Sequence, residues 1–200
     1  MENPDSREEI TAKELLGRYQ KGERDFRRIK LKNSEHLSSV NLEEIDFRHA
    51  CLYIANFRAA DSGNANFIEE CILYSSDFTG ADFRGANLQG TEFSDAILNA
   101  ANFSGADLQG AKFDCADAEA ANFTGANLEG ATFYESNLEG ALMVNANLKN
   151  AELLQTPFEG VDLSNVDLTG ALNASLEGAI LHNTIMPDGS IASNNSTNKR

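Results

Sequence analysis

The chain has 200 residues, a formal net charge of −15 and an apolar fraction of 42%. It is too apolar to be disordered and long enough for one domain with its own core, without disulfide staples. No stretch approaches the roughly eighteen apolar residues of a membrane-spanning helix, and the charged start MENPDSREEI lacks the apolar region of a secretory signal, so we expect a cytoplasmic protein.

The first predicted element is a short helix within an N-terminal segment, residues 1–23. Thr11 is a suitable N-cap, and Glu14 follows at the spacing of a capping box. Leu15 lies on the apolar face of the predicted helix. We therefore expect a helix over about 12–21 that lies across the exposed end of the structure that follows.

Charge is distributed unevenly along the chain. Residues 1–36 carry nine Lys or Arg against eight Asp or Glu, whereas residues 37–181 carry five against twenty-two. An acidic body repels phosphates, so direct nucleic-acid binding is not expected. Basic residues gather just before this body in a segment that we call the basic collar: Arg24, Arg27, Arg28, Lys30 and Lys32.

The central part, predicted as one domain over residues 24–191, has a period of five. From Leu73 to Leu168, eighteen of the twenty residues at this spacing are Leu or Phe, and the exceptions are Ala118 and Met143. The residue two positions before each of these centres is usually alanine. In a helix, successive centres would rotate by about 140°, and in a flat strand they would alternate between faces. The chain must therefore turn once per unit, and a glycine two residues after many centres suits such a corner.

Two places interrupt this period. In an earlier block with a shifted register, Ser62 occupies one centre, which we interpret as a local distortion rather than a site. The step from Phe67 to Leu73 is six residues, which predicts a bulge or a longer corner. After Leu168 the pattern slips by three residues, and the polar residues 192–200 are predicted to be a disordered tail.

Units such as ADFRG, ANLQG, ANFSG and ANFTG resemble the pentapeptide repeat family. The resemblance implies an all-β solenoid, a right-handed quadrilateral β-helix with four repeats per twenty-residue coil, here about seven coils with a short N-terminal α-helical cap. The stretches ELLGRYQKGERDF and TIMPDGSI resemble cyanobacterial members. The centres also alternate Phe and Leu with a period of ten, which favours four or two repeats per coil over three. With four, two ladders form: Phe83, Phe103 and Phe123 opposite Phe93, Phe113 and Phe133.

No catalytic or cofactor pattern stands out. The three histidines lack a partner at a catalytic spacing, the three cysteines contain no CxxC pair, and the glycines recur at corners rather than in phosphate loops. Polar residues before the centres, such as Asn102 and Asp107, recur wherever the repeat does, so we interpret them as wall residues rather than metal ligands. We expect no enzyme, no cofactor and no metal.

Outward-facing apolar residues are the candidate partner site. We predict that Tyr134, Leu142, Val144 and Leu154 form one patch across neighbouring faces. The expected function is that of an interaction scaffold or regulatory binding protein, which binds an unidentified protein as a monomer or weak dimer without membrane contact. One cyanobacterial member that the chain resembles acts in heterocyst differentiation.

The alternative implied by the resemblance is DNA mimicry. Some members of the family bind type II topoisomerases with an acidic, rod-shaped dimer. The acidic body of this chain fits that function. The loops of the quinolone-resistance members and a recognisable C-terminal dimerisation helix are missing from the sequence.

Overall fold

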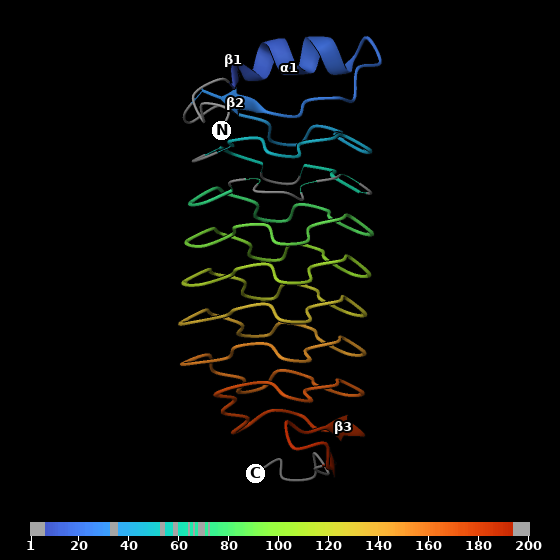
Figure 1. Ribbon diagram of the computed structural model, residues 1–200, viewed down its shortest axis with the longest axis vertical. Coiled ribbons are helices and arrows are strands. Elements are labelled where there is room, and N and C mark those ends of the chain that lie inside the picture. Colours follow the sequence, from blue (N-terminus) through green and yellow to red (C-terminus); the bar gives the residue numbers. More distant parts are fainter. Residues whose placement is uncertain are drawn as a thin grey trace, which may run out of the picture.

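The computed structural model describes residues 7–32, 36–52, 55–57, 60–63, 65, 67, 71 and 73–193. The chain winds in loops that stack along one axis into a rod (Figure 1). Helix α1 (Ala12–Tyr19) lies across one end of the rod, and strand β3 (Thr184–Ile185) lies near the other. Within the described residues, no helix has the length and apolar character needed to cross a membrane.

The walls of the rod are held together by parallel pairing between residues twenty positions apart. Asn102 pairs with Asn122, and Asp107 pairs with Asn127 in the same way. The Phe103 N–H donates to the carbonyl oxygen of Asn122 at 2.7 Å. A twenty-residue coil built from five-residue units has four sides, so the pairing selects four repeats per coil over two.

We name these sides by the coil of residues 101–120. Side A is 101–105, side B is 106–110, side C is 111–115 and side D is 116–120, and each side recurs one coil later. The middle residue of every unit points inward, as at Phe103, where the side chain is fully buried. The last two residues of each unit form the corner that leads to the next side.

Two aromatic ladders fill the core from opposite walls. On side A, the Phe103 ring stacks on Phe123 with centroids 5.0 Å apart and planes at 3°. On side C, the Phe113 ring stacks on Phe133 at 4.8 Å and 6°. The ladders meet edge to face, with Phe113 and Phe123 5.7 Å apart at 88°. Both ladders predicted from the alternation of Phe and Leu are confirmed.

Each corner places its last residue in the left-handed region of backbone conformation. Gly105 has φ 67°, and Cys115 has φ 57° at the equivalent position of side C. Because glycine adopts this region without strain, it is common at the corners. The polar residue before each centre supports the turn: Asn102 Oδ1 accepts from the Ser104 N–H at 3.1 Å. The interpretation of these residues as wall residues is confirmed for Asn102.

The N-terminal region combines a helix with a short parallel sheet. Strand β1 (Glu8–Ile10) pairs with β2 (Ile29–Leu31). Between them α1 begins with the predicted capping box: the Glu14 N–H donates to Thr11 Oγ1 at 3.2 Å, and the Thr11 N–H donates to Glu14 Oε2 at 2.8 Å. The helix ends at Tyr19, earlier than the predicted residue 21, because the chain turns there.

Ladder pairing begins near the N-terminal sheet, where Asp25 pairs with Asp46. Across the irregular region, Asn41 pairs with Asp61 twenty residues later, but Asp61 pairs with Asp82 after twenty-one. This change of spacing agrees with one inserted residue. The insertion predicted between Phe67 and Leu73 itself lies largely outside the described residues.

The C-terminal coil is tighter than the others and ends in a hairpin. Asp162 pairs with Ile180 only eighteen residues later, which reflects the slip seen in the sequence. Strand β3 then pairs antiparallel with β4 (Ile191–Ala192). Ala192 was predicted to belong to the tail, but it is paired with Thr184, so ordered structure extends past residue 191. Residues 194–200 lie outside the described residues.

Candidate binding surfaces

The structure divides the basic collar into three groups. Arg24 packs over the Tyr19 ring, with its guanidinium carbon 3.7 Å from the ring centroid. On β2, Lys30 Nζ lies 3.7 Å from a carboxylate oxygen of Glu9, and Lys32 directly follows the same strand. These three residues support the N-terminal elements. Only Arg27 and Arg28 remain together at a corner of the rod.

That corner joins sides B and C, and the next coil adds two more cationic or titratable side chains to it. The Arg28 N–H donates to the Arg48 carbonyl oxygen at 3.0 Å, so Arg27 and Arg28 lie directly above Arg48 and His49. Sequence analysis missed Arg48 and His49 because they belong to another segment of the chain. Their spacing of twenty-one residues from Arg27 and Arg28 was the available signal.

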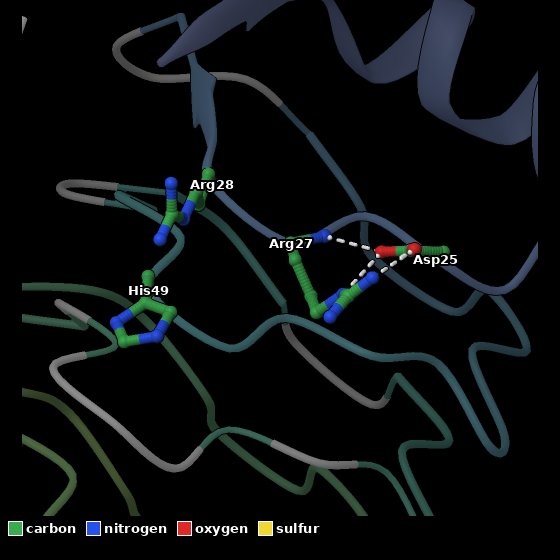
Figure 2. Close-up of a pocket in the computed structure, with 4 residues that line it drawn as sticks. All are labelled: Asp25, Arg27, Arg28 and His49. Atoms are coloured by element: carbon green, nitrogen blue, oxygen red, sulfur yellow. Dashed lines mark hydrogen bonds and ion pairs between the residues drawn. The ribbon is translucent and has the colours of Figure 1, made fainter. Parts of the chain in front are cut away.

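A hollow of about 380 Å³ opens at this corner (Figure 2), lined by Asp25, Arg27, Arg28 and His49. Arg27 holds Asp25 with two hydrogen bonds, from Nε to Oδ1 at 2.8 Å and from Nη2 to Oδ2 at 2.7 Å. These bonds lower the pKa of Asp25 to about 2, so its carboxylate stays ionised near neutral pH. Figure 2 shows Arg28 and His49 side by side, apart from the Asp25–Arg27 pair.

The predicted apolar patch does not form as one surface. Tyr134 and Leu154 are one coil apart on the corner between sides C and D, where the Glu135 N–H donates to the Leu154 carbonyl oxygen at 3.2 Å. Leu142 pairs with Asn122 on side A, and Val144 follows at the next corner. Ten residues are half of a twenty-residue coil, so the two pairs lie on different sides of the rod rather than on neighbouring faces.

Acidic residues cluster around the corner that carries Tyr134 and Leu154. The Ala100 N–H donates to the Glu119 carbonyl oxygen and the Ala120 N–H to that of Glu139, each at 2.8 Å, so these glutamates stack one coil apart at the corner after side D. We call the region from the corner before side D to the corner after it the acidic side. Its carboxylates are Asp77, Asp95, Asp114, Asp117, Glu119, Glu135, Glu139, Glu159 and Glu177.

Basic residues of the same coils lie on the other sides. Within the described residues 73–193, the lysines and arginines are Arg84, Lys112 and Lys149. Each is ion-paired: Arg84 to Asp82 at 2.6 Å on side A, Lys112 to Glu92 at 3.0 Å on side C, and Lys149 to Asp167 at 3.1 Å on side B. The acidic side therefore keeps its negative charge while the other sides are partly neutralised.

Tyr134 and Leu154 are embedded in this acidic side. They are 38% and 39% exposed, so each presents a substantial apolar surface. Tyr134 Oη donates to Glu135 Oε1 at 2.8 Å, which fixes the ring and raises the pKa of its hydroxyl. Tyr134 and Leu154 therefore form an exposed apolar surface that is bordered by carboxylates.

Groups that could support metal or thiol chemistry are dispersed. In the part of the chain that the structure describes, no three His, Cys, Asp or Glu side chains are arranged to hold a metal ion. Cys51, Cys71 and Cys115 are free thiols. Full burial raises the pKa of Cys71, so this thiol stays protonated and unreactive.

The model of pentapeptide repeats matches the chain in eight copies, in segments that run from residues 50–90 to residues 141–186. The chain belongs to the pentapeptide repeat family. Pentapeptide repeats imply a right-handed quadrilateral β-helix, and the four-sided coils of the rod agree with it. Proteins of this family are generally structural or binding proteins. Comparison with curated protein sequences gave no match.

Several solved pentapeptide repeat structures are similar to the chain. HetL, involved in heterocyst differentiation regulation in the cyanobacterium Nostoc sp. strain PCC 7120, is 26% identical; the match covers 92% of this chain and 100% of HetL, with a TM-score of 0.31. The Nostoc protein alr5209 is 29% identical over 60% of this chain and 85% of its own, with a TM-score of 0.34. A trypsin-treated variant of QnrB1, a plasmid-mediated fluoroquinolone resistance protein, is 18% identical over 89% of each chain, with a TM-score of 0.56. The likeness to QnrB1 concerns the fold alone.

Proposed function

We propose that this pentapeptide repeat protein is a non-enzymatic, cytoplasmic interaction scaffold, monomeric or weakly dimeric, that binds a protein through its acidic side. The observation that carries the proposal is the pair Tyr134 and Leu154, exposed one coil apart among carboxylates. Protein interfaces combine a few apolar or aromatic anchors with a polar rim. The partner expected from this chemistry offers an apolar contact bordered by lysine or arginine.

The architecture suits such a role because it holds the surface rigidly. We propose that residues 24–191 form about seven coils capped by the segment 1–23, and the burial of Leu15 supports this arrangement. Side chains on successive coils keep a fixed spacing of about 4.8 Å, so little ordering entropy is lost when a partner binds.

The test is affinity capture from an extract of the organism that encodes the chain. The tagged wild-type protein is compared with a Tyr134→Ala, Leu154→Ala variant and with a Leu142→Ala, Val144→Ala control on the other side of the rod. We expect the first variant to lose proteins that the wild type and the control retain. Equal capture by all three would contradict the proposal, as would a loss confined to the control.

The role of charge is tested separately with Glu119→Gln, Glu139→Gln and Glu159→Gln in one variant. A matched variant removes three glutamates from elsewhere, namely Glu44, Glu129 and Glu152, so both change the net charge equally. Capture should weaken only for the acidic-side variant, and more strongly at low salt because exposed charges are screened at high salt. Equal weakening by both variants would show that net charge, not the acidic side, determines binding.

DNA mimicry of the kind that binds a type II topoisomerase is the second candidate, and the charge density of the acidic side supports it. Its nine carboxylates lie between residues 77 and 177, within about six coils. At about 4.8 Å per coil this is roughly one charge per 3 Å, close to the one per 3.4 Å of a single DNA strand. The apolar side chains of Tyr134 and Leu154 have no counterpart in a phosphate backbone, which is why we prefer the scaffold.

A DNA gyrase supercoiling assay with micromolar purified protein tests this second candidate. Mimicry predicts inhibition, or protection from a quinolone, that the Glu119→Gln, Glu139→Gln, Glu159→Gln variant loses and the matched charge control keeps. Unchanged supercoiling in the presence of the wild-type chain would remove the candidate.

A further inference from the structure

We propose that the acidic side binds a basic amphipathic α-helix of the partner, which lies along the rod and crosses several coils. This inference rests on the proposed function, because it names the form of the protein segment that the acidic side binds. The surface involved extends well beyond Tyr134 and Leu154 and ends at a hollow of about 310 Å³.

Exposed apolar side chains follow one another along the acidic side in the direction of the rod axis. Tyr74 lies in the same corner column as Tyr134 and Leu154, three coils before Tyr134. Ile97 pairs with Asp117 on side D and, at 43%, is the most exposed of the four apolar side chains. Between residues 73 and 160, all of which the structure describes, five large apolar side chains are exposed and four of them lie here. A line of contacts over five coils suits an elongated element of a partner better than a single side chain.

The spacing of this line matches one face of an α-helix. At about 4.8 Å per coil, Tyr74, Ile97, Tyr134 and Leu154 lie at about 0, 5, 14 and 19 Å along the rod. Helix residues i, i+4, i+11 and i+14 share one face and lie at about 0, 6, 16.5 and 21 Å along the helix axis. The two series agree within about 2 Å, a difference that flexible side chains accommodate.

Backbone pairing favours a helix over an extended segment on this side. Asp77, Ile97, Asp117 and Asn137 pair in series from coil to coil. Their backbone groups are used within the rod, as where the Leu98 N–H donates to the Asp117 carbonyl oxygen at 2.6 Å. A strand that adds to a sheet needs a free edge, whereas a helix satisfies its own backbone and binds through side chains.

Charge determines the composition of this helix. The carboxylates of the acidic side border the whole line, and the lysines and arginines of residues 73–193 lie on the other sides. Asp114 and Asp117 belong to the coil between Ile97 and Tyr134, so the apolar contacts are separated by negative charge. The complementary helix has lysine or arginine on both flanks of its apolar face.

The hollow gives one basic side chain of the helix a defined contact. Side D pairs in series as far as Asn137, and the next place in that column is taken by Pro157, which has no N–H to donate. The hollow at this interruption is lined by Asn137, Glu139, Pro157 and Glu159. It lies on the same two coils as the corner pair, so the lysine or arginine that follows the last apolar residue of the helix enters it.

Binding is tested by fluorescence anisotropy with the full chain and three labelled synthetic peptides at low salt. The first has leucine at i, i+4, i+11 and i+14 with lysine and arginine on the flanks. The second has the same composition with the leucines spread around the helix, and the third is the first peptide with a central proline, which breaks the helix. We expect the first peptide to bind about tenfold or more tightly than the others and to gain helical circular dichroism on binding.

Three results would overturn the proposal. Equal binding of all three peptides would show attraction by charge alone. Tightest binding of the proline peptide would assign the acidic side to an extended segment. The absence of saturable binding of the first peptide at micromolar concentration would show that the surface does not hold a helix.

A matched pair of variants locates the helix on the rod. Ile97→Asn introduces the residue type of Asn137 in the same column, and Leu142→Asn introduces on side A the residue type of Asn122 in its column. Both replace an exposed apolar side chain, so both should fold like the wild type, which urea midpoints verify. We expect Ile97→Asn to weaken binding of the first peptide about fivefold or more, and Leu142→Asn to change it less than about twofold. Equal effects of the two variants would contradict binding on the acidic side.

A second pair of variants tests the hollow. Glu139→Gln with Glu159→Gln removes its two carboxylates, and Glu129→Gln with Glu152→Gln is the control of equal net charge. Binding of the first peptide should weaken about threefold or more only in the former pair. Equal weakening in both would show that the hollow makes no specific contact with a basic side chain.

The outcomes separate the helix from the proposed function. If the Tyr134→Ala, Leu154→Ala variant loses captured proteins but Ile97→Asn binds the first peptide like the wild type, the acidic side binds its partner in another form and the helix is overturned. If that double variant captures proteins normally while binding of the first peptide depends on Ile97, the helix site stands and the proposed anchor pair fails.

Discussion

Replacing Phe113 by alanine tests the inward ladder on which the fold depends. The Phe113 ring is fully buried and stacks on Phe93 at 5.2 Å and on Phe133 at 4.8 Å. Truncating a buried Phe to Ala typically costs about 3–5 kcal/mol, because transfer energy is lost and a cavity remains. Loss of two stacked partners and the edge contacts to side A places this site at the upper end, at about 4–5 kcal/mol.

The assay is urea unfolding followed by far-ultraviolet circular dichroism, with Leu154→Ala as the control. Leu154 is 39% exposed, so its truncation should change the free energy of unfolding by less than about 0.5 kcal/mol. A Phe113→Leu variant introduces the residue most common at the centres of sides B and D. It should retain more than half of the stability that Phe113→Ala loses. If Phe113→Ala is within about 0.5 kcal/mol of the wild type, the ladder does not carry the stability that we assign to it.

Two further predictions concern how single side-chain contacts change the free energy of unfolding. Ser62 is 1% exposed and its Oγ has no hydrogen-bond partner in the described structure, whereas buried Ser136 Oγ donates to the Phe113 carbonyl oxygen at 2.7 Å. Ser62→Ala should therefore raise, and Ser136→Ala lower, the free energy of unfolding by about 1 kcal/mol each, and equal destabilisation in urea melts would contradict this reasoning. Because Arg27 lowers the folded-state pKa of Asp25 to about 2 from 3.8, the carboxylate contributes stability above pH 3.8 and loses it as the pH falls toward 2. Urea melts from pH 2 to 6 should show a difference between wild type and Asp25→Asn that is constant above about pH 4 and vanishes near pH 2; a difference independent of pH would exclude the ion pair as its source.

The interior of the rod was predictable because its constraints repeat. One large and one small inward residue per five, with Phe alternating with Leu, is a pattern that only a chain turning once per unit can bury. The ladders of Phe103 with Phe123 and of Phe113 with Phe133 follow from it directly. The choice of four repeats per coil over two needed the pairing of residues such as Asn102 and Asn122, which periodicity of residue type does not specify.

Outward positions were harder to predict because they carry no periodic constraint. Tyr134 and Leu142 were expected on neighbouring faces, yet a separation of about half a coil places them on different sides. Arg28 and His49 are adjacent for the opposite reason, since a full coil with one extra residue brings them together. Surface neighbours in this fold are separated by twenty or twenty-one residues, so a search at that spacing identifies clusters that local sequence hides.

Repulsion between the carboxylates of the acidic side favours the binding of a basic partner. The backbones of Glu119 and Glu139 on successive coils are about 4.8 Å apart along the rod. Like charges held at that spacing in water would repel by up to about 1 kcal/mol per pair. Other sides relieve this repulsion with cations, such as Arg84 beside Asp82 and Lys149 beside Asp167. The fold does not require glutamate at the corner after side D, since Thr79 and Asn99 occupy the same column. A repulsive, replaceable row of charges around exposed apolar side chains lowers the stability of the free chain, and a basic partner would relieve that repulsion on binding.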